Sequence, residues 1–313
     1  MDLSVLAPSP TLLLAGVVLD AVLGDPVYRL HPIRLMGATI SGCETALRRI
    51  GLDGRFGGCL LLLLVGTAWV GLLSALTVVL GMVFHVFVVF SMVAMGDLIK
   101  HGNRVDRAAQ AGDEAEARRA ISMIVGRDTA RMDVAACRRA AIESLSESLV
   151  DGFMSPIFWY ALAGLPGMVL FKVISTMDSM VGYKTPKYFY FGWCGARADD
   201  VANWVPARLS WLLLSLLAVF VPGCSGKKAL RVGWRQHALV PGPNAGWSEA
   251  TASGAIQRRL VGPIWRKGEL VTEVWLGDQA DPPANHRADY KRAVWIVSAT
   301  AFGFVAGVLA LLT

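Results

Sequence analysis

A long uncharged segment is the feature that most constrains the fold of this chain. Residues 59–96 contain one histidine and no aspartate, glutamate, lysine or arginine. A buried helix of a soluble domain is shorter than this, whereas about 20 apolar residues cross the hydrocarbon layer of a bilayer once. Because Gly81 divides the segment, the sequence predicts a hairpin of two membrane-spanning helices, 59–80 and 82–96.

Composition extends this interpretation to the whole chain. It is 54% hydrophobic and only 17% charged, with a mean hydropathy of +0.49, which is typical of an integral membrane protein. Two of the other apolar segments contain polar residues or prolines, Asp20 in the first and Pro156, Pro166 and Lys172 in 153–174, so we expect broken, tilted or re-entrant elements there. The six apolar segments are 10–24, 59–80, 82–96, 153–174, 208–223 and 294–312.

The polar stretches between these segments predict the topology. Lysine and arginine gather in them, with five arginines in 25–57, nine basic residues in 97–152 and eleven in 224–293. The positive-inside rule places all three in the cytoplasm. The stretch 175–207 carries Lys184, Lys187 and Arg197, and we place it on the same side. Segments 153–174 and 208–223 would then re-enter the membrane or lie within the bundle.

We therefore predict an all-α, polytopic integral membrane helical bundle with cytoplasmic helical loops. It would form a single domain over residues 1–313 in the cell inner membrane, with its active site on the cytoplasmic side. We expect no cleavable signal peptide, because no basic region precedes the first apolar segment. The five cysteines include no CxxC pair, so we expect reduced thiols. The net charge of +6 suits a surface facing anionic lipid, and we expect no nucleic acid partner.

The stretch 97–152 contains signals for two amphipathic helices. Asp113 is placed to cap a helix carrying the Glu114/Arg118 pair, and Asp133 to cap a second helix that ends at Gly152. On the second helix Glu143, Glu147 and Asp151 recur at intervals of four, hence on one face. Two interpretations stay open, a solvated acidic face and a site for magnesium or an ammonium group.

A second polar block lies beside two apolar segments. Asp199 and Asp200 are adjacent, and Asn203 follows one turn later. Such a group binds Mg²⁺ that bridges nucleotide phosphates. The alternative is structural, with Asp199 as a helix cap and Arg208 extending its charge to the membrane surface.

The N-terminal block contains two further candidates. Asp20 lies inside an apolar run, which makes it a functional candidate. His31 suits either a general base or a turn histidine. Walker-type GxxxxGK[ST], GxSxG and HExxH motifs are absent from the sequence.

In their order and spacing, these blocks resemble the cobinamide-phosphate synthase family, membrane enzymes of cobalamin biosynthesis. The resemblance runs nearly from end to end. It is carried by LDAVLGDPVYRLHPIRLMG (19–37), ARRAISMIVGRDT (117–129), ESLSESLVDGFMSPIFW (143–159), STMDSMVGYKTPKY (175–188), FGWCGARADDVANWVPARL (191–209), PNAGW (243–247) and GELVTEVWLGD (268–278). Ser148 and Ser175 depart from the family pattern, which has asparagine at both positions, so these two are weaker ligand candidates.

The resemblance implies an ATP-dependent amide ligase that joins adenosylcobyric acid to (R)-1-amino-2-propanol or its O-phosphate. ATP and Mg²⁺ would be the cofactors, and the lipid bilayer and other corrinoid-pathway enzymes the further partners. The implied catalytic residues are Glu143, Glu147, Asp151, Asp178 and His31, and the implied metal ligands are Glu147, Asp199 and Asp200. The implied substrate and phosphate-binding residues are Arg34, Arg127, Asp128, Ser179, Tyr183, Lys184, Arg197, Asn203, Arg208 and Asn244.

Two other functions stay open. Asp20 and His85 inside apolar runs would suit the solute path of a transporter, although the polar residues gather in the loops rather than at helix breaks in the membrane. A noncatalytic membrane sensor on the same scaffold is the second, and the intact carboxylates count against it.

Overall fold

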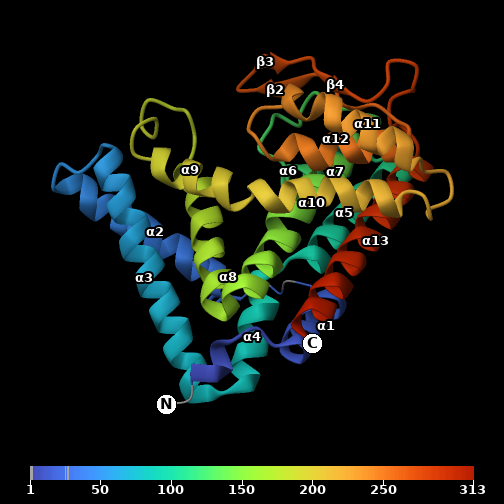
Figure 1. The fold of residues 1–313 in the computed structure, drawn as a ribbon. Coiled ribbons are helices and arrows are strands. Elements are labelled where there is room, and N and C mark those ends of the chain that lie inside the picture. The colour runs from blue at the N-terminus through green and yellow to red at the C-terminus, as the bar shows by residue number, and fades with distance from the viewer. Residues whose placement is uncertain (1–2, 25, 27) are drawn as a thin grey trace. The chain divides into compact units, whose positions relative to one another are not determined.

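The structure is a computed structural model that describes residues 3–24, 26 and 28–313 (Figure 1). Asp25 and Val27, which belong to the sequence block 19–37, lie outside the described residues. The chain divides into two compact units. The first comprises Met1–Ala94, Asp151–Asn203 and Val305–Thr313, and the second Met95–Val150 and Trp204–Phe304. The prediction of one domain over the whole chain stays a prediction.

Helices build both units, as predicted. The first unit contains the short η1 (Leu3–Leu6), α1 (Pro10–Leu23), α2 (Pro32–Arg49), α3 (Arg55–Leu80), α4 (Met82–Met92), α8 (Ser155–Val181) and α9 (Trp193–Ala202). The second contains α5 (Met95–Ala111), α6 (Glu114–Ser122), α7 (Val134–Ser148), α10 (Trp204–Leu217), α11 (Gly226–Gln236), η3 (His237–Leu239), α12 (Ala245–Ile256) and most of α13 (Arg287–Leu312).

The second unit also contains short strands that the sequence reasoning missed. They are β1 (Leu260–Val261), β2 (Ile264–Arg266), β3 (Glu269–Thr272) and β4 (Trp275–Leu276). β1 pairs with β4 and β2 with β3, both antiparallel. Lys267 and Gly268 close the β2–β3 turn with positive φ angles of 53° and 81°, and glycine adopts such angles without steric cost.

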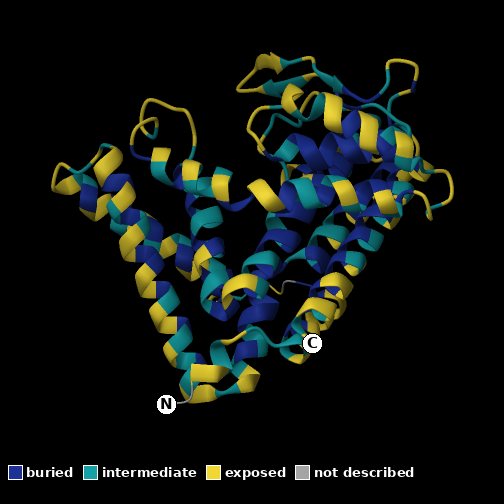
Figure 2. Ribbon diagram, in the orientation of Figure 1, coloured by how far each residue is buried: buried dark blue, intermediate teal, exposed yellow. Residues whose placement is uncertain are grey.

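The apolar surface of the helices supports the membrane class. Among the residues that the structure describes, four helical stretches are long and apolar enough to cross a membrane: Arg55–Leu80, Met82–Ala111, Val134–Val181 and Arg287–Leu312. On α3 the buried residues form a narrow stripe that includes Leu61, Val65, Trp69 and Leu73, and Figure 2 shows exposed residues along the rest of this helix. An exposed apolar face of this length is what lipid covers.

The predicted segment 208–223 is too short to cross the membrane as one helix. Its helical part, α10, has 14 residues and is therefore about 21 Å long, whereas the hydrocarbon layer is about 30 Å thick. α10 packs against α11 and α12 instead. There the Trp211 indole N–H donates a 3.1 Å hydrogen bond to the Leu230 carbonyl.

The segment 153–174 forms a hairpin rather than one straight helix. Helical geometry breaks within α8 at Ala163 and at Gly164, where φ is +64°, and the chain reverses direction there (Figure 1). Both ends of the hairpin reach the same place, since Ser155 contacts Asn203 and Asp178 lies beside Asp199. The two arms of α8 therefore form a hairpin whose ends lie together, and the re-entry of this segment into the membrane stays a prediction.

The closed end of this hairpin holds the N-terminal segment in place. His85 shares a 2.8 Å hydrogen bond with the Tyr160 hydroxyl and a 2.7 Å hydrogen bond with the Val5 carbonyl. The Ser9 amide donates to the same hydroxyl at 3.0 Å. These bonds satisfy a buried histidine with protein groups, which gives His85 a structural role.

The predicted helix signals of 97–152 are confirmed, with one change. Asp113 caps α6 by accepting from the Glu116 amide, and Asp133 caps α7 by accepting from the Ala136 amide. α7 stops at Ser148, and a π-helical turn, η2 (Leu149–Met154), follows instead of further α-helix to Gly152. Because a π-turn inserts a residue into the helical repeat, it shifts Asp151 from the regular spacing of Glu143 and Glu147.

Candidate functional site

The open end of the α8 hairpin gathers polar side chains against α9. The Ser155 hydroxyl donates a 2.5 Å hydrogen bond to the Asn203 side-chain carbonyl, and the Asn203 amide donates a 3.0 Å hydrogen bond to the Asp199 carboxylate. Ser155 and Asn203 are buried. The chain Ser155–Asn203–Asp199 therefore fixes one carboxylate at the mouth of the hairpin, and we call this group with Asp178 and Asp200 the aspartate cluster.

The carboxylates of the aspartate cluster are partly buried and repel one another. Burial, and after it the neighbouring Asp178 carboxylate, raise the pKa of Asp199 to about 7 although the hydrogen bond from Asn203 lowers it. Asp200 forms a 3.0 Å ion pair with the exposed Arg197. Carboxylates that repel one another in a partly buried site favour a bound cation.

The donor set of the aspartate cluster fits Mg²⁺ that arrives with a phosphate ligand. Among the described residues, no group of three or more His, Cys, Asp or Glu side chains is placed to hold a metal ion. Mg²⁺, however, usually takes one or two carboxylates and completes its octahedron with water and phosphate oxygens. Asp199 and Asp200 provide such a pair. Glu147, the third predicted ligand, belongs to the second unit, and the joint ligand set stays a prediction.

A second polar group lies in the second unit around the start of β1. The Glu143 carboxylate is buried on α7, where it forms a 2.5 Å ion pair with Arg127 and accepts a 3.0 Å hydrogen bond from the Val261 amide. Val261 has a φ of +68°, a strained conformation for a β-branched residue. Glu143 thus uses both oxygens to hold the Arg127 loop and a strained strand end together.

Glu147 lies one turn further along α7. Its carboxylate faces a cavity, whereas the Glu143 carboxylate is bound by Arg127 and Val261. The exposed Glu147 side chain lines this cavity of about 250 Å³ with Ser144, Arg127 and Arg266. Within the described part of the chain, no hydrogen bond to its carboxylate is found. A carboxylate without a hydrogen-bond partner is available to accept a proton or to bind an ammonium group.

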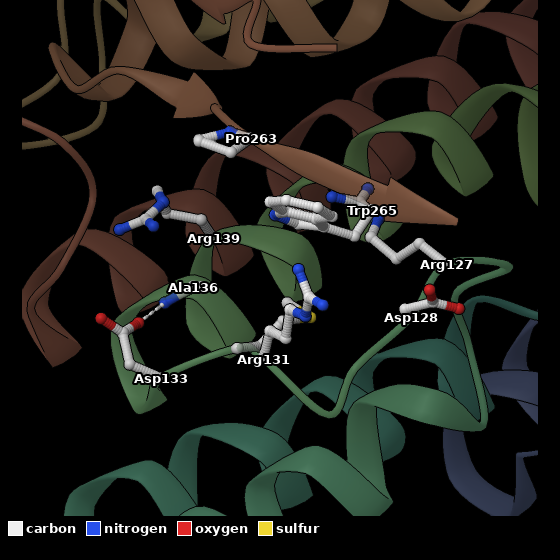
Figure 3. Close-up of a pocket in the computed structure, with 9 residues that line it drawn as sticks. Arg127, Asp128, Arg131, Asp133, Ala136, Arg139, Pro263 and Trp265 are labelled. Carbon is white, nitrogen blue, oxygen red and sulfur yellow. Dashed lines mark hydrogen bonds between the residues drawn. The ribbon is translucent and has the colours of Figure 1, made fainter. Parts of the chain in front are cut away.

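An adjoining cavity of about 200 Å³, which also includes Arg127, is rich in arginine. Figure 3 shows Arg131 reaching the ring of Trp265, with Arg139 and Arg127 on either side. The Arg131 guanidinium lies 4.2 Å from the centroid of that ring. We call Arg127, Arg131 and Arg139 the arginine cluster.

The acidic residues around the arginine cluster are already engaged. Asp133 caps α7, and Asp128 accepts a 2.7 Å hydrogen bond from the Gly268 amide. Three guanidinium groups against two carboxylates leave the lining of this cavity with a net positive charge, which favours an anion, and guanidinium groups match the oxygens of carboxylate and phosphate. Sequence reasoning selected Arg127 and Asp128 but missed Arg131, Arg139 and Trp265. Arg139 lies one turn before Glu143 on the same helix, which was a usable signal.

Two other predicted residues meet in the second unit. Arg208 donates a 3.0 Å hydrogen bond to the side-chain carbonyl of the buried Asn244. Its guanidinium also lies 4.3 Å from the Trp204 ring and 5.0 Å from the Trp247 ring. The pair fixes the start of α12, where Trp247 packs in the core with Val150 and Ala207.

The remaining predicted residues are more dispersed. His31 is buried and caps α2 by accepting a 3.3 Å hydrogen bond from the Ile33 amide, a structural role that leaves its catalytic role a prediction. Asp151 lies on the π-turn of the first unit. The side chains with a surface position are Arg34, Ser179, Tyr183 and Lys184.

Fold and site together define a class: a polytopic helical membrane protein with two candidate sites, an aspartate cluster and an arginine cluster. The chain belongs to the CobD/CbiB protein family, whose family model matches residues 13–297. This confirms the family resemblance.

Curated relatives match nearly the whole chain. It is 39% identical over 302 residues to "Cobalamin biosynthesis protein CobD" of Klebsiella pneumoniae, covering 93% of this chain and 94% of the relative. It is 37% identical over 299 residues to "Cobalamin biosynthesis protein CbiB" of Salmonella typhimurium, with 92% and 93% covered. A CobD of a Sinorhizobium species is 42% identical over 276 residues, with 84% and 85% covered. No solved structure matches this chain.

Proposed function

We propose that this protein acts in cobalamin biosynthesis as an ATP-dependent amide ligase. The reaction would join a carboxylate of adenosylcobyric acid to the amino group of (R)-1-amino-2-propanol or its O-phosphate. Family membership and the names of the relatives support the pathway. The carboxylate and arginine side chains described above support the type of reaction. We further propose the cell inner membrane as its location, with both clusters facing the cytoplasm.

The reaction needs two kinds of group. A carboxylate is a poor electrophile, so ATP must first convert it to an acyl phosphate or an acyl adenylate. The amine then attacks the acyl carbon, the phosphate or adenylate leaves, and the ammonium proton passes to a base. The site therefore needs cations for phosphate oxygens and a free carboxylate or imidazole for the proton.

In this proposal the aspartate cluster serves the nucleotide. Asp199 and Asp200 would hold Mg²⁺, which when bound offsets the negative charge of the phosphates. Asn203 and Ser155 orient Asp199 through their hydrogen bonds. Arg197 and Lys184, both exposed in the same unit, provide cations for phosphate oxygens.

The second unit would supply the anion site and the base. The arginine cluster binds a phosphate or a corrin carboxylate or amide oxygen, and Glu143 is a positioning residue that holds Arg127. Glu147 accepts the amine proton. The observation that carries this assignment is the free Glu147 carboxylate in a cavity with Arg127 and Arg266.

The test is amide formation by membranes carrying Glu147→Gln, with ATP, Mg²⁺, adenosylcobyric acid and either form of the aminopropanol. Loss of a general base lowers kcat by about 10²- to 10⁴-fold. The deficit should shrink at higher pH, where more amine is already deprotonated. Glu269→Gln is the matched control, because Glu269 is exposed on β3 of the same unit.

Each outcome decides one part of the proposal. A rate equal to that of the parent protein removes Glu147 from the mechanism. A deficit that excess Mg²⁺ restores, without a change in pH profile, assigns Glu147 to the metal instead. Absence of amide product from the parent protein, under conditions in which a relative makes it, rejects the ligase function.

A further inference from the structure

A cavity of about 460 Å³ lies between α5 and α13 in the second unit, and none of its lining residues belongs to either cluster named above. Its size falls in the range of small-molecule sites, about 300 to 1,000 Å³. Its lining combines cationic and amphipathic side chains: Asn103, Asp106, Arg107, Arg287, Tyr290, Lys291, Val294 and Trp295.

Two contacts fix the register of the helices beside this cavity. The Tyr290 hydroxyl donates a 3.2 Å hydrogen bond to Asn103, and Arg287 donates a 3.3 Å hydrogen bond to Asp106. As residue numbers rise on α13 they fall on α5, so the helices run antiparallel and residue 294 lies level with about residue 99.

This register places the cavity at the edge of the membrane. On α13 the charged residues end at Arg292 and the apolar run begins at Val294, and on α5 the apolar run ends just before Asp97. Both changes from polar to apolar thus fall within a few ångströms of one level. The lining of the cavity reaches this level at Val294 and Trp295, and such a change from polar to apolar residues is typical of the headgroup region of a bilayer.

The charges of the cavity are not balanced within the protein. Asp106 is buried and forms a 2.8 Å ion pair with Arg138 in addition to its contact with Arg287. Arg107 is exposed, and within the described residues the one hydrogen bond found for its guanidinium goes to the Asn103 carbonyl, at 3.3 Å. Lys291 is exposed, and no partner for its ammonium group is found among the residues that the structure describes. The opening therefore presents two cations to an anionic group.

An apolar surface continues from the cavity along α13. Trp295 and Phe302 are 69% and 68% exposed. They lie seven residues apart, hence on one face with Lys291. Along this face of α13, a lysine is followed by a tryptophan and then by a phenylalanine. This order matches the order of headgroup, interface and acyl chains in one leaflet of a bilayer.

We propose that this cavity binds the phosphodiester headgroup of an anionic phospholipid. Arg107 and Lys291 contact the phosphate oxygens, the Asn103 side chain hydrogen-bonds the headgroup, and an acyl chain lies against Trp295 and Phe302. A basic hollow between helices at a cytoplasmic membrane surface suits such a lipid. The proposal is independent of the ligase assignment.

The test is retention of phosphatidylglycerol by the full chain in detergent, measured by native mass spectrometry during titration. Phosphatidylcholine and inorganic phosphate serve as the comparison ligands. A basic residue near the surface contributes about fivefold to binding of an anionic lipid. Arg107→Gln/Lys291→Gln should therefore weaken phosphatidylglycerol binding about 30-fold, and Lys291→Gln alone about fivefold.

Lys227→Gln/Arg235→Gln is the matched control, since it removes two exposed charges from α11 of the same unit. The proposal requires unchanged phosphatidylglycerol binding in this control and weak phosphatidylcholine binding in the parent protein. Equal retention of both lipids by the parent, or equal loss in the two double variants, overturns it. Displacement of the lipid by inorganic phosphate at millimolar concentration would show a site for soluble anions instead.

Discussion

The ion pair of Glu143 and Arg127 offers a direct measure of what holds the arginine cluster in place. Their side chains are 5% and 17% exposed, and the two groups are 2.5 Å apart. In Glu143→Gln the single amide oxygen can accept from Arg127 or from Val261, and the amide N–H₂ faces the other donor. Removing one partner of a buried pair costs about 3 to 5 kcal/mol. Because Arg127 is partly exposed, we expect a loss of about 3 kcal/mol.

The assay is unfolding in mixed micelles by titration with sodium dodecyl sulfate, followed by the fluorescence of the ten tryptophans. Glu114→Gln is the control, because the Glu114–Arg118 pair is also 2.5 Å long but 46% and 33% exposed. An exposed pair contributes about 0 to 1 kcal/mol. Because the two ion pairs have the same length and differ in burial, the comparison separates the effect of burial from that of distance.

A double-mutant cycle with Arg127→Met completes the measurement. Glu143→Gln/Arg127→Met leaves no buried guanidinium without a partner, so it should be more stable than the sum of the single changes predicts by about 1 to 3 kcal/mol. Strictly additive losses, or equal losses for Glu143→Gln and Glu114→Gln, would refute the role of Glu143 as the residue that positions Arg127.

Two further predictions concern the first unit. Because the pKa of Asp199 is raised to about 7 from 3.8, its contribution to stability is full below about pH 4 and is lost as the pH rises through 7. In EDTA the free energy of unfolding should fall over this range by at most about 1.4 kcal/mol per pH unit, and Asp199→Asn should flatten the fall. An unchanged slope in the variant would exclude Asp199 as its source. Gly164→Ala should lower stability by about 1 to 3 kcal/mol, because φ is +64° there and the new methyl would meet the Leu6 carbonyl. Gly71→Ala, in α3 with open space around it, should change stability by less than about 1 kcal/mol, and equal effects at the two glycines would argue against a tight hairpin tip.

Local signals explain why much of the fold was predictable. The uncharged run at 59–96 and the helix caps Asp113 and Asp133 act within a few turns of chain, so spacing alone identifies them. The sequence indicated a broken helix in 153–174 through Pro166, but it did not indicate that the break lies at Gly164. The short strands at 260–276 were missed, because segments of two to four residues carry too weak a pattern to be recognised.

For the candidate sites, too, the sequence predicted some features and missed others. The sequence identified Asp199, Asn203, Glu143 and Arg127 as polar residues in a mostly apolar chain. It did not show that Ser155 would orient Asn203. Nor did it show that the Glu143 carboxylate would bind Arg127 and Val261, while the Glu147 carboxylate would face a cavity. Such contacts join residues as many as 118 positions apart.

What the sequence by itself determined is the membrane class, the all-α fold and the family, because each depends on composition, periodicity or ordered blocks of residues. Only the tertiary structure decided which charged groups are paired and which face a cavity. The physical reason is that a carboxylate has the same chemistry wherever it lies in the chain. Its availability depends on the partners that folding brings within hydrogen-bonding distance.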